Sequence, residues 1–105
     1  MISVMNNTKW TELQGAMYEL GSQCPEWRNK ICTTGYISSW DDEWYYHFST
    51  GGFKDIEWIE LKIENDLQKS LVLKELKKIH VPGHETENGF RVYGYIHPGN
   101  EVNYL

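Results

Sequence analysis

The stretch TGYISSWDDEWYYHFSTGGFKDIEWIELKI, residues 34–63, decides the fold of this chain. It is rich in aromatic and β-branched residues, which fit a pleated and half-buried surface. Its acidic run and its glycine pair are typical of turns, so the stretch is expected to form three successive strands. The predicted strands are 36–40, 44–48 and 56–63, and the predicted turns are Asp41–Glu43 and Ser49–Gly52.

A hairpin with Asp42–Glu43 as its two-residue loop would pair Trp40 with Tyr45 and Ile37 with Phe48. Paired residues share one face of a sheet, and successive residues alternate between the faces. The face of Ile37 and Phe48 also carries Trp44 and Tyr46, and it suits the aliphatic residues of the third strand, so it is expected to face the core. The opposite face then collects Tyr36, Trp40, Tyr45 and His47, together with Trp58 and Glu60 from the third strand.

Two amphipathic helices flank these strands. Apolar residues recur at steps of three and four over 9–20 and over 67–79, which predicts one helix in each range. Residues 21–33 contain Pro25 and are expected to form a loop, and residues 1–7 a loose lead. The two apolar stripes are expected to pack against the aliphatic face of the sheet.

A fourth strand is predicted after the second helix. Asn88–Gly89 is a strong turn signal, and residues 90–96 follow it as a strand. The complete order is α-β-β-β-α-β, which predicts a single α+β domain over 1–105, with a four-stranded, mainly antiparallel sheet and both helices on one face. The other face would be open, and the last strand would add Arg91, Tyr93 and Tyr95 to it.

Composition excludes several classes of function. The chain has 105 residues and a formal charge of −5, which argues against nonspecific nucleic-acid binding because such binding depends on neutralising phosphates. No apolar run approaches the roughly 20 residues of a membrane helix, and the first residues do not resemble a secretory signal. We therefore expect a cytoplasmic protein in which Cys24 and Cys32 are free thiols.

Signals for catalysis and for metal binding are weak. The spacing of Cys24 and Cys32 is wrong for a zinc knuckle, so no metal and no cofactor are expected. No catalytic motif is found, although His84, Glu85 and Glu87 form a possible acid–base trio. Three functions stay open: a protein-binding module, a small enzyme or ligand-binding protein that uses this trio or a pocket beneath 21–33, and a self-associating protein.

Four segments, KWTELQGAMYEL, GYISSWDDEWYYHF, IEWIELKI and IHVPGHETENGFRVYGYIHPG, resemble a family of small uncharacterised bacterial proteins. This family has no established activity to transfer. By analogy with other small acidic bacterial proteins, we expect an immunity protein that binds and neutralises a cognate toxin, such as a basic toxin domain. Exposed aromatic residues are typical anchors of such interfaces. The expected partner-binding residues are Trp40, Asp41, Asp42, Glu43, Tyr45, His47, Trp58, Tyr93 and Tyr95.

Overall fold

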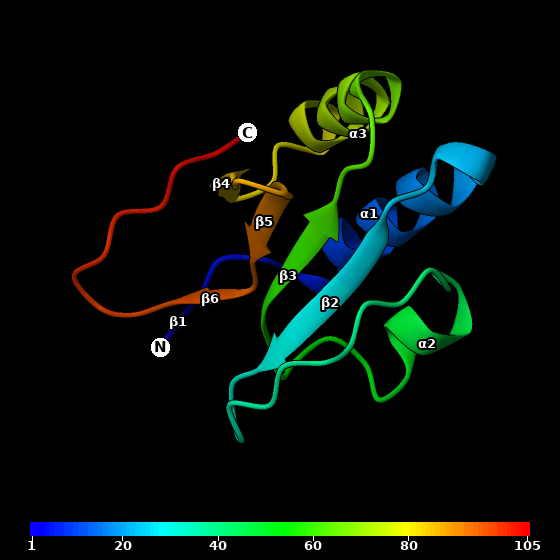
Figure 1. Ribbon diagram of the computed structural model, residues 1–105. Helices are drawn as coiled ribbons and strands as arrows, with labels where there is room; N and C mark the ends of the chain where they lie inside the picture. Colours follow the sequence, from blue (N-terminus) through cyan, green and yellow to red (C-terminus); the bar gives the residue numbers. More distant parts are fainter.

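A four-stranded antiparallel sheet in the order β2-β3-β5-β4 forms the centre of the computed structural model, which describes residues 1–105 (Figure 1). Helices α1 and α3 pack on the same face of this sheet. The predicted α+β class, with a four-stranded sheet and two helices on one face, is therefore confirmed. The strands are β2 (Glu26–Ile31), β3 (Ile56–Lys62), β4 (Gly83–Glu85) and β5 (Gly89–Tyr93).

The two long helices begin at asparagine caps. Helix α1 (Asn7–Glu19) begins after Asn6, whose side chain accepts a hydrogen bond from the backbone N–H of Lys9 at 2.8 Å. Helix α3 (Asp66–Ile79) begins after Asn65, which accepts from the N–H of Gln68 at 2.8 Å. Such caps satisfy backbone donors that the helix itself leaves unpaired. The apolar stripes bury Trp10, Leu13 and Met17 from α1 and Val72 and Leu76 from α3.

The first strand of the sheet is β2, which lies within the segment predicted to be a loop. Its side chains alternate: Trp27 faces the core, whereas Arg28 and Lys30 face the open side. The predicted strand 36–40 forms no ladder with 44–48. Residues 36–41 instead run along the outer edge of β2, to which they are joined by isolated bridges from Trp27 to Asp41 and from Lys30 to Ile37.

The predicted strand 44–48 is also wrong, because this segment contains the short helix α2 (Tyr46–Ser49). Trp44 and Phe48 are buried as expected, and they pack on Trp27 with ring centroids 6.0 and 5.2 Å away. Ile37 and Tyr46, expected in the core, are exposed. The segment therefore covers the β2 end of the core as a helical turn rather than extending the sheet.

Two further strands lie outside the main sheet. The predicted strand 90–96 is interrupted at Gly94, where β5 ends and β6 (Tyr95–Ile96) begins. Strand β6 pairs with β1 (Ile2–Ser3), so the lead predicted to be loose contributes a short ladder. A single 3₁₀ turn, η1 (Gly21–Gln23), follows α1.

Both edges of the main sheet are covered. Residues 37–41 lie along the outer edge of β2, with backbone hydrogen bonds of 2.8 Å in both directions between Trp27 and Asp41. At the other edge, the N–H of Gly83 donates to Asn103 at 2.8 Å and that of Leu105 donates to Val81 at 2.9 Å. Unpaired strand edges are templates for pairing with other chains. Here residues 37–41 occupy the edge of β2, and residues 103–105 occupy the β4 edge at Val81–Gly83. No helix combines the length and the apolar character needed to cross a bilayer.

Candidate functional site

The open face of the sheet carries one row of charged residues that crosses all four strands. Arg28 on β2 lies opposite Glu60 on β3, Glu60 lies opposite Arg91 on β5, and Arg91 lies opposite His84 on β4. These four residues are called the charged rung. Arg28 and Arg91 are the only arginines in the chain, and both reach the same carboxylate.

Glu60 holds both guanidinium groups by direct hydrogen bonds. Its Oε1 accepts from Nε of Arg28 at 2.7 Å and forms an ion pair with Nη2 of Arg28 at 2.7 Å. Its Oε2 accepts from Nε and Nη2 of Arg91 at 3.2 and 2.7 Å. Each guanidinium also lies over an indole: Arg28 is 4.7 Å from the ring centroid of Trp40, and Arg91 is 4.3 Å from that of Trp58. Cation–π contact and ion pairing therefore fix both arginines together.

The environment of Glu60 favours its ionised form. Burial raises the pKa of this carboxyl, but the hydrogen bonds and positive charges of Arg91 and Arg28 outweigh burial and hold the pKa below its ordinary value. A carboxyl with a lowered pKa in the folded state stabilises the fold above the pKa of the unfolded chain. That stabilisation is lost as the pH falls through the folded-state pKa.

Replacing Glu60 by glutamine is expected to lower the free energy of unfolding by about 2 kcal/mol at pH 7. This loss lies between the typical losses for breaking an exposed and a buried ion pair. The difference from wild type should shrink below about pH 4.3, where an unfolded glutamate becomes protonated. Urea titrations at pH 7 and pH 3.5 measure both quantities. Glu64→Gln, at an exposed partner of Lys62, is the control and should change stability little at either pH. A pH-independent difference for Glu60→Gln would contradict the expected linkage.

Two residues of the possible acid–base trio, His84 and Glu87, line one hollow on the open face, and Glu85 lies apart from them. His84 lies on the open face, where its Nε2 is 3.0 Å from the hydroxyl of Tyr93. Glu85, the next residue of the strand, turns to the helix side and pairs with Lys69 at 3.0 Å. Glu87 lies in the turn between β4 and β5. No group of three or more His, Cys, Asp or Glu side chains is placed to hold a metal.

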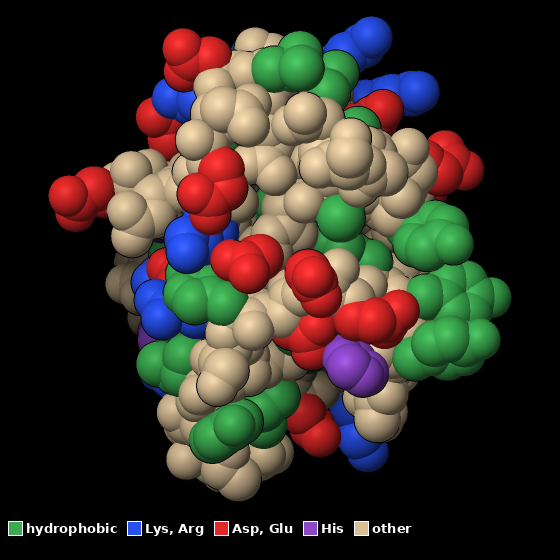
Figure 2. All heavy atoms as spheres, turned by 45° about the vertical axis from the view of Figure 1, so that its right-hand side comes forward, with side chains coloured by type: hydrophobic (Ala, Val, Ile, Leu, Met, Phe, Trp, Pro, Cys, Tyr) green, Lys and Arg blue, Asp and Glu red, His purple; other side chains and the backbone are tan.

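A second surface surrounds α2. The side chain of Gln14 on α1 donates to the backbone carbonyls of Trp44 and Tyr45 at 2.8 and 2.7 Å, which ties this segment to α1. The ring of Tyr18 then lies 5.8 Å from that of Tyr45, which lies 4.9 Å from that of Tyr46. These three rings are 58%, 55% and 72% exposed. Together with Asp41, Asp42, Glu43 and His47 they are called the acidic tyrosine patch (Figure 2).

The three carboxylates of this patch have different roles. Glu43 caps α2: hydrogen bonds from the backbone N–H of His47, and also from those of Tyr45 and Tyr46, hold its pKa below the ordinary value. Asp41 accepts a hydrogen bond from the N–H of Glu43 and lies 2.8 Å from Nδ1 of His47. Asp42 is exposed and makes no such contact, so it is the carboxylate most available to a partner.

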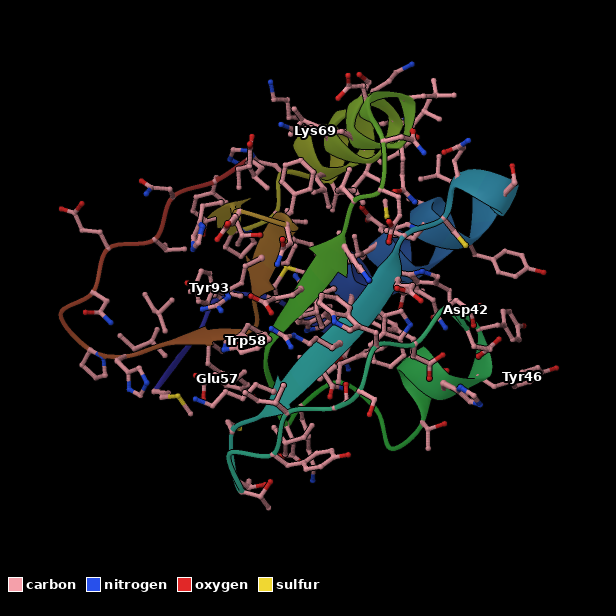
Figure 3. All side chains as sticks on the ribbon, viewed as in Figure 1. Asp42, Tyr46, Glu57, Trp58, Lys69 and Tyr93 are labelled. Carbon is pink, nitrogen blue, oxygen red and sulfur yellow. The ribbon has the colours of Figure 1, made fainter.

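The structure divides the predicted partner-binding residues between the two surfaces. Trp40, Trp58 and Tyr93 lie on the open face, whereas Asp42 and the neighbouring residues lie near α2 (Figure 3). Trp58 is only 6% exposed, because Arg91 covers it. Tyr95 belongs to neither surface, since its hydroxyl donates to the backbone of Lys54. Near α2 lie Asp41, Asp42, Glu43, Tyr45 and His47.

A comparison with protein-family models gives one match. The model described as a family of unknown function (DUF6678) covers residues 1–99 of the chain. The chain belongs to the DUF6678 family. The predicted membership of an uncharacterised family is confirmed, and the DUF6678 match includes every residue of the charged rung and of the acidic tyrosine patch. Neither the curated proteins nor the solved structures gave a match.

Sequence reasoning missed three residues of these surfaces in this DUF6678 chain. Arg28 was assigned to a loop, although the pattern of Glu26, Arg28 and Lys30 alternates as in a half-exposed strand. Tyr18 follows Met17 directly and so lies off the apolar stripe of α1, which was a signal for an exposed aromatic residue. Tyr46 was assigned to the core because 44–48 was predicted to be a strand.

Proposed function

We propose that this member of the DUF6678 family is a non-enzymatic binding protein, and specifically a bacterial immunity protein that neutralises a cognate toxin by covering it. The observation that carries the binding proposal is the acidic tyrosine patch. Tyrosine is enriched at the centres of protein interfaces, where its ring gives a large contact area at a low entropic cost. The immunity proposal adds an analogy with other small acidic binding domains.

The patch combines exposed rings with negative charge. Tyr18, Tyr45 and Tyr46 lie in one contiguous row, and Asp42 and Glu43 line a shallow hollow together with Tyr18. Exposed clusters of large side chains usually mark interaction sites. The charge of −5 would accelerate association with a basic partner such as a nuclease toxin domain. The expected mode of inhibition is steric, with the tyrosines as anchors and the carboxylates steering the encounter.

Exchanging Tyr46 for alanine is expected to weaken binding by on the order of 2 kcal/mol, as loss of a central aromatic anchor does. The protein is co-expressed with the products of neighbouring genes, and the affinity of each complex is measured by surface plasmon resonance. Tyr36→Ala is the matched control, because Tyr36 is 62% exposed but lies beside the end of β2, outside the patch. Equal losses from both exchanges would contradict a role for the patch.

Asp42 tests the electrostatic part of the proposal. Asp42→Asn should mainly slow association, with a smaller effect at high salt, because the carboxylate is exposed and screened by ions. Glu43 is unsuitable for this test, since its carboxylate caps α2 and its removal would disturb the fold of the patch. If none of the neighbouring products forms a complex, the immunity proposal fails.

A further inference from the structure

The charged rung adjoins a hollow on the open face that the proposed function does not use. The hollow has a volume of about 270 Å³, and most of the side chains that line it are polar. Trp40 closes it on the β2 side, and the turn between β4 and β5 closes it on the other side. Its polar lining comes from Arg28, Glu60, His84, Thr86, Glu87, Asn88 and Arg91.

Both arginines keep donors for a ligand. The hydrogen bonds and ion pairs with Glu60 are made by Nε and Nη2 of each arginine, so the Nη1 amino groups of Arg28 and Arg91 are not used by Glu60. The two side chains are 36% and 30% exposed, so a ligand in the hollow can reach them. Because each guanidinium is already held by Glu60 and by an indole, little further side-chain entropy is lost when it binds a ligand.

The balance of charge selects the class of ligand. Two guanidinium groups and one carboxylate leave a net charge of +1 in the rung, on a protein whose overall charge is −5. Glu87 at the rim brings the formal charge of the whole lining to zero, which disfavours a doubly charged anion more than a singly charged one. We propose that the hollow binds a carboxylate, whose planar pair of oxygens matches the planar donors of arginine. Asn88 in the turn between β4 and β5 would supply additional hydrogen bonds, whereas both ring nitrogens of His84 already have partners in Glu85 and Tyr93.

The arginine Nε–Hε signals of the ¹⁵N-labelled full-length protein report on this site directly, because the chain has only two arginines. Sodium acetate is titrated against sodium chloride at constant ionic strength and pH 7. Saturable shifts of both signals with acetate, and none with chloride, are expected. Linear shifts that are equal for the two salts would overturn the proposal. Tighter binding of inorganic phosphate than of acetate would overturn the choice of a singly charged ligand.

Two variants separate binding from stability. Arg28→Lys keeps the charge but loses the planar fork, and it should weaken acetate binding at least tenfold. Lys30→Gln removes a charge from the same face without touching the hollow, since Lys30 pairs with Glu57, and it should change the affinity less than twofold. Amide spectra of both variants confirm that the fold is kept. Equal weakening by both exchanges would show a general charge effect and overturn the site.

The carboxylate could come from the C-terminus of a peptide or from a small organic acid. An acetylated dipeptide with a free carboxyl terminus and its amidated form distinguish these two sources. Binding of the free form tighter than that of acetate identifies a peptide end as the ligand. Binding no tighter than that of acetate identifies a small organic acid. Equal binding of the free and amidated dipeptides would contradict recognition of the carboxylate.

Discussion

Trp44→Ala should lower the free energy of unfolding by about 4 kcal/mol, a typical cost for removing a large buried aromatic side chain. Trp44 is 2% exposed, and its indole N–H donates to the carbonyl of Pro25 at 2.8 Å. Its ring lies 4.7 Å from that of Phe48, so the exchange would leave a cavity between α2 and the sheet. Urea titration followed by far-ultraviolet circular dichroism measures the loss.

Trp40 is the matched control for this exchange. It is the same residue type four positions earlier, but it is partly exposed and lies against the guanidinium of Arg28. Trp40→Ala should lower the free energy of unfolding by only about 1 kcal/mol, the size of one cation–π contact. Equal losses for the two tryptophans would contradict the placement of Trp44 in the core and of Trp40 on the open face.

Gly89→Ala should lower the free energy of unfolding by about 3 kcal/mol, because an added methyl group has no room in this part of the sheet. A Cβ on Gly89 would lie 1.9 Å from the carbonyl oxygen of Leu61 on the neighbouring strand. Backbone atoms cannot rotate away as a side chain does, so the pairing between β3 and β5 has to shift. Thermal unfolding of the variant measures this loss.

Gly15→Ala is the opposite case and serves as the control. Gly15 is exposed in α1, and a Cβ there would meet nothing within 4 Å. Alanine is a better helix former than glycine, so this exchange should raise the free energy of unfolding by about 0.5 to 1 kcal/mol. If the free energy of unfolding rises for Gly15→Ala and falls for Gly89→Ala, added methyl groups have no general effect. The loss at Gly89 is then due to the close approach of β3 and β5.

The spacing of Trp44 and Phe48 explains why 44–48 was assigned to a strand. Residues four apart share a face in a strand and also in a helix, so these two buried rings fit both structures. Tyr46 distinguishes them: a strand would bury it between Trp44 and Phe48, but it is 72% exposed. The carboxylate of Glu43, which caps the turn, was the available signal for a helix start.

Strand β2 escaped prediction because its partners are distant in sequence. Glu26 and Arg28 gain their ion-pair partners only when β3 lies beside them, with Lys62 and Glu60 at the positions opposite. A polar strand of this kind resembles a loop until the cross-strand pairs are known. The helices and β3 were predictable, since apolar periodicity within each segment is a local property.

Part of the candidate site could be predicted from the sequence, because alternation within a strand is a local property. Alternation placed Trp58, Glu60 and Arg91 on one face correctly, and Arg91 and Glu60 are direct neighbours there. The covering of Trp58 by Arg91 depends on side-chain geometry, which no alternation pattern contains. Tyr45 was placed with Trp40 because of the assumed hairpin, and without that hairpin the two residues belong to different surfaces.

The covered sheet edges determine how this protein would aggregate. Growth of a fibril by backbone pairing requires a bare strand, and movement of residues 37–41 or 103–105 would bare the edge of β2 or the Gly83 end of β4. The C-terminal segment is held against the β4 edge by two backbone hydrogen bonds, those between Gly83 and Asn103 and between Val81 and Leu105. Detachment of these last residues needs no unfolding of the core. Local opening at this terminus would therefore bare part of the β4 edge without global unfolding.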